Sequence, residues 1–209
     1  MKIIRQPSFD EGFPYIAYIP EKLSTHPALL IQLHGAGERG EGSEALDKVL
    51  VHGFCKIATD ENLEDCILLM PQCPENSFWI AKIESLKRFI DNFVEKYCID
   101  TGRIYLCGLS MGGYGTWNTA MAYPDLFAAI APCCGGGMAW NADILKMPIW
   151  AFHGKEDSVV SVRNTVEMIE KLDGKNPYFK YTLYDGVDHD SWVRAFSPEL
   201  LSWLKAQHK

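Results

Sequence analysis

The sequence predicts an α/β fold with a mostly parallel central sheet and helices on both faces. Short apolar runs such as Ala28–Leu33 and Ile67–Met70 are typical of strands buried on both sides. They alternate with segments of helical periodicity, of which 83–97 is the clearest, with apolar residues at i, i+3 and i+7. Strands that alternate with helices form parallel sheets, because each crossover lays a helix on one face of the sheet.

The elements follow one another without a break. The expected strands are 3–6, 15–19, 28–33, 67–70, 104–107, 127–132, 148–152 and 178–184. The expected helices are 44–58, 83–97, 116–122, 161–172 and a last one that begins at Ser197 and Pro198, a serine N-cap followed by proline in the first turn. No repeat, low-complexity tract or linker interrupts them, so we expect a single domain over 1–209.

Composition narrows the class of protein. A chain of 209 residues, 47% of them hydrophobic, can bury its own core. The net charge of −7 disfavours nucleic acid as a partner, because nucleic-acid binding needs a basic face. No stretch could span a bilayer and the start lacks the apolar core of a signal peptide. The seven cysteines match no zinc spacing, and free, mostly buried thiols such as Cys66 and Cys107 indicate a reducing compartment. We therefore expect a cytoplasmic protein with no membrane partner, a monomer or homodimer.

The strongest motif is Gly108-Leu109-Ser110-Met111-Gly112, a G-x-S-x-G pentapeptide between an apolar strand and a helical segment. A sharp strand-to-helix turn holds such a serine in a strained conformation that exposes its hydroxyl, and small residues let the two backbones pass closely. An incidental serine in a glycine-rich turn is the alternative. The strand before and the helix after favour Ser110 as a nucleophile, with the N–H of Met111 beside it to stabilise an oxyanion.

Two more loops are expected at the same sheet edge. His34-Gly35-Ala36-Gly37-Glu38-Arg39-Gly40 follows a buried strand, and in an esterase this loop supplies the second oxyanion N–H, here that of Ala36. A phosphate loop is disfavoured because the G-K-[ST] ending is missing. Glu38 and Arg39 contact substrate or form a surface ion pair, and we favour the ion pair. Phe78 and Trp79, in the loop after 67–70, either wall a substrate pocket or pack within the loop.

A serine nucleophile needs a histidine base and a carboxylate that orients it. His189 is the histidine that closely follows the strand 178–184, and Asp157 follows the strand 148–152. We assign them as base and acid. Glu156 is adjacent to Asp157 but points elsewhere in a tight turn, and Asp185 and Asp188 precede His189 too closely to reach its Nδ1 easily. His34 and His153, each followed by glycine, are expected to be structural.

These motifs together resemble the α/β-hydrolase superfamily. L-H-G-A-G-E-R-G, P-Q-C-P-x-x-x-x-W, G-L-S-M-G-G-Y-G, H-G-x-x-D-x-x-V and V-x-H-x-x-W are similar to the phospholipase/carboxylesterase branch, which includes polyhydroxybutyrate-depolymerase-like and feruloyl-esterase-like enzymes and is close to the prolyl oligopeptidase catalytic domain. The resemblance covers about residues 13 to 205. It implies the α/β-hydrolase fold, hydrolysis of carboxylic esters and no cofactor. We expect a small-molecule ester as the substrate and no metal.

The expected activity is that of a serine carboxylesterase. An exopeptidase or acyl transferase on the same fold, or an inactive binding protein, are the alternatives. The segment from Cys133 to Met147, where such folds commonly carry a lid, is too short for a helical cap. We therefore expect no large lid, an open cleft walled by Trp79, Trp140 and Trp192 together with Phe78, and a preference for short acyl groups.

Overall fold

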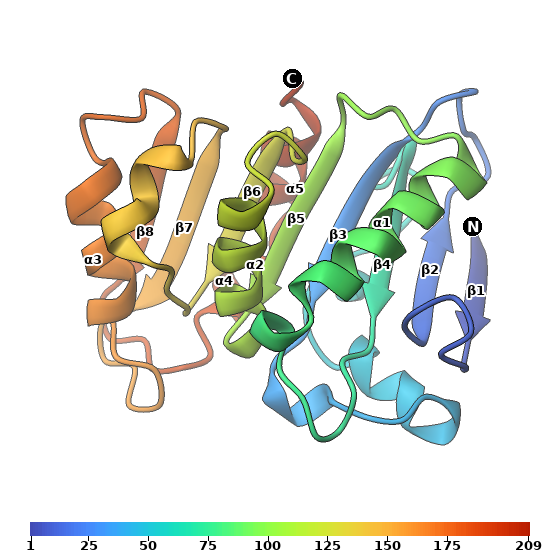
Figure 1. Ribbon diagram of the computed structural model, residues 1–209, viewed down its shortest axis with the longest axis horizontal. Helices are drawn as coiled ribbons and strands as arrows, with labels where there is room; N and C mark the ends of the chain where they lie inside the picture. Colours follow the sequence, from blue (N-terminus) through green and yellow to red (C-terminus); the bar gives the residue numbers. More distant parts are fainter.

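The computed structural model describes residues 1–209 and is built around one eight-stranded sheet (Figure 1). Its strand order is β1-β2-β4-β3-β5-β6-β7-β8. The strands are β1 (Lys2–Gln6), β2 (Tyr15–Ile19), β3 (Ala28–Leu33), β4 (Cys66–Pro71), β5 (Ile104–Leu109), β6 (Ala129–Cys133), β7 (Ile149–Gly154) and β8 (Phe179–Tyr184). β2 pairs antiparallel with both β1 and β4, and every other pair is parallel. The predicted α/β fold with a mostly parallel sheet is confirmed.

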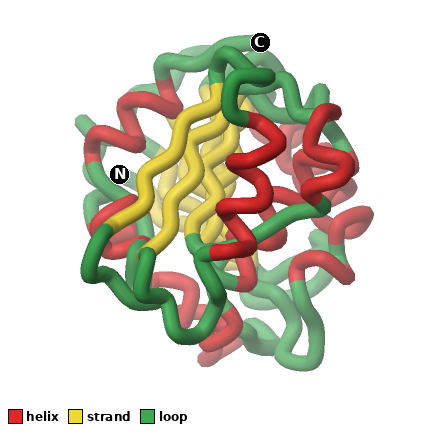
Figure 2. The backbone as a smooth tube through the Cα atoms, turned by 90° about the vertical axis from the view of Figure 1, so that its left-hand side faces the viewer, coloured by secondary structure: helices red, strands yellow, loops and turns green.

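Helices cover both faces of the sheet, as the end-on view in Figure 2 shows. The α-helices are α1 (Ile83–Tyr97), α2 (Met111–Ala122), α3 (Arg163–Leu172), α4 (Trp192–Ala195) and α5 (Pro198–Lys205). Buried residues of α1, α2 and α3 belong to one hydrophobic core, whereas those of α4 and α5 belong to a second core on the opposite face. The chain thus forms three layers, with the sheet in the middle.

The apolar runs alternate between these two cores. In β3, Leu29 and Ile31 pack into the core under α1 to α3, and Leu30 packs into the core under α5. Side chains of a strand point alternately to opposite faces, so a strand covered on both sides must be apolar throughout. This explains why the central strands lack the apolar–polar alternation of a half-exposed strand.

The segment 44–58 is not the single helix that its pattern predicts. It forms two 3₁₀-helices, η2 (Ser43–Leu50) and η3 (Phe54–Lys56), separated at Gly53, whose φ is +93°. The side chain of Gln32 from β3 lies against this break, where its Oε1 accepts the N–H of Phe54 at 2.7 Å and its Nε2 donates to the carbonyl of His52 at 2.9 Å. A buried side chain thus takes up backbone groups that a continuous helix would pair internally.

Three shorter 3₁₀-helices lie in loops: η1 (Ala36–Glu38), η4 (Trp79–Ala81) and η5 (Ala139–Ile144). No helix is both long enough and apolar enough to cross a bilayer. All seven cysteines are unpaired, and five of them are buried, including Cys66 and Cys107.

Candidate active site

Ser110 occupies the turn between β5 and α2 in a strained conformation. Its φ is +52° and its ψ −116°, a combination that a residue with a side chain adopts only when its surroundings enforce it. A Cβ on Gly108 would overlap the carbonyl oxygen of Gly112, and a Cβ on Gly112 would overlap that of Leu33. The two glycines are therefore required by the close approach of β3, β5 and α2. The turn has the geometry expected of a nucleophile elbow.

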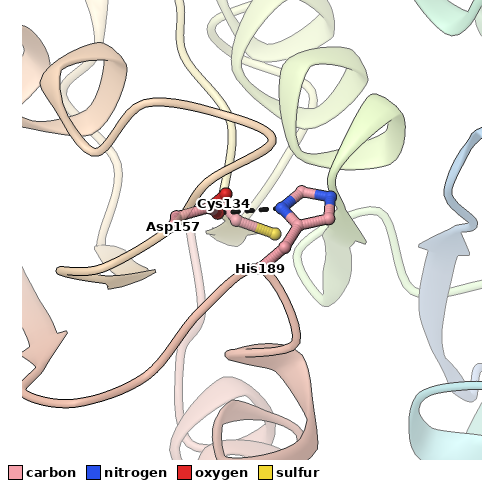
Figure 3. Close-up of side chains that lie close together, drawn as sticks. All are labelled: Cys134, Asp157 and His189. Carbon is pink, nitrogen blue, oxygen red and sulfur yellow. Dashed lines mark hydrogen bonds and ion pairs between the residues drawn. The ribbon is translucent and has the colours of Figure 1, made fainter.

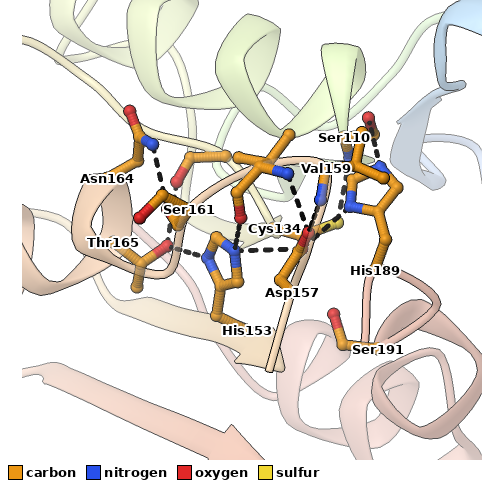
Figure 4. Close-up of polar contacts among 12 residues, drawn as sticks. Ser110, Cys134, His153, Asp157, Val159, Ser161, Asn164, Thr165, His189 and Ser191 are labelled. Carbon is orange, nitrogen blue, oxygen red and sulfur yellow. Dashed lines mark hydrogen bonds and ion pairs between the residues drawn. The ribbon is translucent and has the colours of Figure 1, made fainter. Parts of the chain in front are cut away.

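Three side chains from three loops form a hydrogen-bonded chain (Figure 4). Oγ of Ser110 lies 2.9 Å from Nε2 of His189, and Nδ1 of His189 lies 2.8 Å from Oδ2 of Asp157. Because the carboxylate only accepts hydrogen bonds, Nδ1 carries the proton and Nε2 is left to accept the serine proton. The loops after β5, β7 and β8 thus bring together the nucleophile, acid and base expected from the sequence.

Asp157 is held rigidly in this chain. Its side chain is fully buried, and its Oδ1 accepts the N–H groups of Val159 at 3.0 Å and Val160 at 2.7 Å. Its Oδ2 also lies 3.2 Å from Nε2 of His153. These donors stabilise the carboxylate in place without solvent.

The other acidic residues near His189 have different partners. Glu156 accepts the N–H of Val187 at 3.0 Å. Asp185 pairs with Lys155 at 2.6 Å. Asp188 accepts the N–H and the hydroxyl of Ser158, and these hydrogen bonds lower the pKa of its carboxyl. None of the three is hydrogen-bonded to the His189 ring.

His153 has a supporting position behind Asp157. Its Nδ1 lies 2.7 Å from Oγ1 of Thr165, and its Nε2 faces the carbonyl of Val160 at 2.9 Å as well as Asp157. Nε2 therefore meets only acceptors and carries the proton. Burial lowers the pKa of His153, so the ring acts as a neutral donor that fixes the acid loop.

Two helical turns begin beside the nucleophile. Met111 begins α2 and Ala36 begins η1, and the N–H groups of a first helical turn have no partner within the helix. Ala36, Ser110 and Met111 line the same surface hollow. An oxyanion hole requires two N–H groups without a partner beside the nucleophile.

His34 orients the peptide that carries the Ala36 N–H. Its Nε2 accepts the N–H of Cys73 at 2.9 Å, so its Nδ1 is protonated and donates to the carbonyl of Gly35 at 2.6 Å. That carbonyl and the Ala36 N–H belong to one planar peptide unit and point in opposite directions. Burial lowers the pKa of His34 to about 4, so the ring remains a neutral hydrogen-bond bridge at neutral pH.

The surface hollow beside Ser110 has a volume of about 240 Å³ and is almost entirely apolar. Its lining consists of Ala36, Phe78, Ile80, Ser110, Met111 and Tyr114. Ile80 and Tyr114 were not predicted as site residues. The spacing of Tyr114 could have indicated it, because it lies one helical turn after the nucleophile. In the structure its N–H donates to the carbonyl of Ser110 at 3.1 Å. Nothing in the sequence indicates Ile80.

The three tryptophans expected to wall the cleft have different positions. Trp79 is fully buried, and its indole donates to the carbonyl of His34 at 3.0 Å. The expectation that it binds substrate is wrong, because it packs in the core beside the loop that follows β3. Trp140, on η5, is 79% exposed and does not line the hollow. The Trp192 ring lies nearly perpendicular to the His189 ring, with a centroid distance of 5.0 Å.

The expected ion pair between Glu38 and Arg39 does not form. Arg39 donates instead to the carbonyls of Ala36 at 2.9 Å and Ser77 at 3.3 Å, and its guanidinium lies over the ring of Phe78. Arg39 thereby connects the loop after β3 to the loop that carries Phe78.

One group of side chains could hold a metal ion. The ligand atoms of Cys134, Asp157 and His189 all lie within 4.8 Å of one another (Figure 3). Cys134 directly follows β6, has a φ of +41°, and its Sγ accepts the N–H of Ser110 at 3.3 Å. The sequence predicts the contact between Asp157 and His189, but no motif indicates that Cys134 lies beside them.

The sheet order, the serine turn and the positions of the three loops define an α/β-hydrolase. Residues 79–196 match the model of the dienelactone hydrolase family. The chain belongs to the dienelactone hydrolase family, and its expected membership of the superfamily is confirmed.

Individual relatives agree with this assignment. The chain is 27% identical over 156 residues to the bifunctional acetylxylan esterase/xylanase XynS20E of Neocallimastix patriciarum, covering 69% of this chain and 21% of that protein. It is 29% identical over 137 residues to poly(3-hydroxyalkanoate) depolymerase C of Paucimonas lemoignei, covering 50% of this chain and 30% of that protein. A crystal structure of a thermostable esterase superposes with a TM-score of 0.81 and 31% identity, over all of this chain and 63% of the other. The chain thus spans less than a third of either curated relative.

Proposed function

We propose that the protein is a serine carboxylesterase that hydrolyses small carboxylic esters. The observation that carries the proposal is the hydrogen-bonded chain from Oγ of Ser110 through His189 to Asp157. Such a chain raises the reactivity of a serine that is otherwise a poor nucleophile. Its position in an apolar hollow, beside the first turns of α2 and η1, fits an acyl-transfer reaction.

In the proposed mechanism, Nε2 of His189 takes the proton of Ser110 as Oγ attacks the ester carbonyl. The tetrahedral oxyanion accepts hydrogen bonds from the N–H groups of Ala36 and Met111. The protonated His189 then gives its proton to the leaving alcohol, and Asp157 stabilises the imidazolium. Water then gives a proton to His189 and attacks the acyl carbon, and His189 returns the proton to Oγ of Ser110 as the carboxylic acid leaves. Every step uses groups of the chain and water, so we expect a chelator such as EDTA to leave the rate unchanged.

We further propose that short acyl groups are the preferred substrates. The hollow holds only about 240 Å³, and Phe78 and Ile80 on its rim are about half exposed. It can therefore enclose a short acyl chain but not a long one. The name of the acetylxylan esterase relative refers to an acetyl group, which is of this size.

The test is the variant Ser110→Ala. We expect it to fold as the parent does and to lose ester hydrolysis by several orders of magnitude, because no acyl-enzyme can form. A fluorophosphonate probe should label the parent at Ser110 and leave the variant unlabelled. Labelling at another residue, or a variant that keeps most of its kcat with p-nitrophenyl acetate, would contradict the assignment.

A further inference from the structure

Cys134 adds a thiol to the side chains of the proposed acid and base. It follows β6, whereas Asp157 and His189 follow β7 and β8, so adjacent strand ends bring three ligands of different chemistry together. Figure 3 shows the sulfur of Cys134 beside the contact between the Asp157 carboxylate and the His189 ring. All three ligand atoms lie within 4.8 Å of one another.

The donor set is one that soft and borderline divalent cations prefer. Zinc binds thiolate sulfur at about 2.3 Å and imidazole nitrogen or carboxylate oxygen at about 2.0–2.2 Å, in tetrahedral geometry. The ligand atoms of such a site are then separated by about 3.3–3.8 Å. Small side-chain rotations from the observed arrangement would reach these separations. Mg²⁺ and Ca²⁺ prefer oxygen ligands and do not match a set with sulfur and nitrogen.

The charges of the cluster also favour a dication. Asp157 is buried, with its carboxylate held by backbone donors, and Cys134 is buried. A carboxylate and a thiolate together would neutralise a divalent ion, which removes most of the cost of placing the ion away from water. The His189 side chain is 18% exposed, whereas that of Asp157 is fully buried, so rotation of the His189 ring would admit the ion.

We propose that Cys134, Asp157 and His189 form an inhibitory binding site for a soft divalent cation such as Zn²⁺ or Cd²⁺. On binding, the Cys134 thiol releases its proton to solvent and the metal takes the Nδ1 lone pair of His189. The Nδ1 proton returns to the ring at Nε2 by way of solvent. With Nε2 protonated, the ring cannot accept the proton of Ser110, and activity stops.

Metal binding itself does not depend on the proposed function, whereas its inhibitory effect rests on it. The first measurement is therefore direct binding of Cd²⁺ to Ser110→Ala, which is expected to be inactive whether or not it binds metal. We expect one Cd²⁺ per chain and the ultraviolet charge-transfer absorption of a Cd²⁺–thiolate bond. The double variant Cys55→Ser/Cys98→Ser, which removes the two cysteines that are not buried, should keep both signals.

Cys134→Ser is the decisive variant, with Cys98→Ser at the exposed cysteine as its matched control. Loss of one ligand should weaken Cd²⁺ and Zn²⁺ binding by at least about tenfold and abolish the charge-transfer absorption, while Cys98→Ser binds as the parent does. Circular dichroism establishes that the variant is folded. If Cys134→Ser does not fold, the test uses the double variant Cys55→Ser/Cys98→Ser with Ser110 intact. In this protein Cd²⁺ must block fluorophosphonate labelling of Ser110 over the same concentrations at which the charge-transfer absorption appears.

The inhibition measurement compares each protein with its own metal-free rate. Zn²⁺ and Cd²⁺ should inhibit the parent and Cys98→Ser equally and inhibit Cys134→Ser only at concentrations at least about tenfold higher. Mg²⁺ and Ca²⁺ should have no effect. Equal sensitivity of Cys134→Ser and the parent, binding without the thiolate absorption, or Cd²⁺ binding that leaves labelling of Ser110 unchanged would each overturn the proposal.

Discussion

Each oxygen of the Asp157 carboxylate has a different task. Oδ1 accepts two backbone N–H groups from its own loop, and Oδ2 faces the rings of His189 and His153. The backbone of the loop therefore orients the Asp157 carboxylate, and the carboxylate orients the His189 ring. Because Oδ2 meets Nδ1 of His189, its ability to accept a hydrogen bond decides which ring nitrogen carries the proton in the proposed reaction.

Replacing Asp157 by asparagine should keep the loop but offer a donor to Nδ1, which leaves His189 in the wrong tautomer. We expect kcat to fall by about 10⁴, the cost found for this change in a serine protease. Asp188→Asn is the matched control, because Asp188 contacts Ser158 rather than the ring, and should cost far less. The comparison requires kcat at neutral pH for the two variants; a larger loss in Asp188→Asn would mean that the acid is misassigned.

The buried ring of His34 should make stability depend on pH. Burial lowers its folded-state pKa from 6.5 to about 4, so the unfolded chain takes up a proton first as the pH falls. The stabilisation is present above pH 6.5 and is lost between pH 6.5 and 4. We expect this ring alone to remove about 2 kcal/mol between pH 7 and pH 5.

Urea unfolding at pH 7 and pH 5 measures this effect. His34→Asn should show a smaller loss of unfolding free energy between the two pH values than the parent. His26→Asn, at an exposed histidine, should match the parent. A loss in His34→Asn as large as that of the parent would show that the acid sensitivity arises elsewhere.

At the scale of elements, the serine turn depends on how closely β3, β5 and α2 approach. The carbonyls of Leu33 and Gly112 occupy the space that side chains would need at Gly112 and Gly108. A helix that begins so close to a strand end also places the Met111 N–H beside the nucleophile. The packing of backbones thus creates both the strain at Ser110 and the proposed oxyanion site.

Gly112→Ala should therefore destabilise the protein by about 1–3 kcal/mol or more, because the added methyl group overlaps backbone that cannot rotate away. Gly37→Ala is the matched control, since a Cβ there meets no atom within 4 Å. Thermal unfolding of both variants provides the measurement. A Gly112→Ala protein as stable as the parent would contradict the close approach.

At the scale of the whole molecule, an apolar hollow lies at the proposed nucleophile, at the edge of the sheet where the strands end. The segment from Cys133 to Met147, where a lid was not expected, forms η5, which packs against α3 and lines no part of the hollow. The rim is formed by the loop of Phe78 and Ile80. An acyl chain longer than the hollow would extend into water.

The p-nitrophenyl ester series tests this geometry. Each buried CH₂ contributes about 0.8 kcal/mol and each exposed one contributes little, so kcat/KM should be highest from acetyl to butyryl and fall beyond about eight carbons. No increase in rate is expected when the substrate forms micelles. An optimum at twelve carbons or more would instead require a buried acyl tunnel.

The sequence by itself determined the fold class and the order of nearly all strands and helices. It also identified the three hydrogen-bonded residues Ser110, His189 and Asp157. These depend on local information: apolar runs specify buried strands, glycines specify tight turns, and in this fold each strand end delivers its next few residues to one edge. The single helix predicted over 44–58 failed because the contact that breaks it, between Gln32 and the backbone near Gly53, is non-local.

Only the tertiary structure decided what surrounds those three residues. Phe78 and Trp79 are neighbours in the chain, yet one lines the hollow and the other lies in the core, because irregular loops have no period from which the direction of a side chain follows. Cys134 lies beside the contact between Asp157 and His189 because β6 pairs with β7, which is also a tertiary feature. Local patterns specify which elements form, whereas the lining of a site depends on distances between residues that only packing brings together.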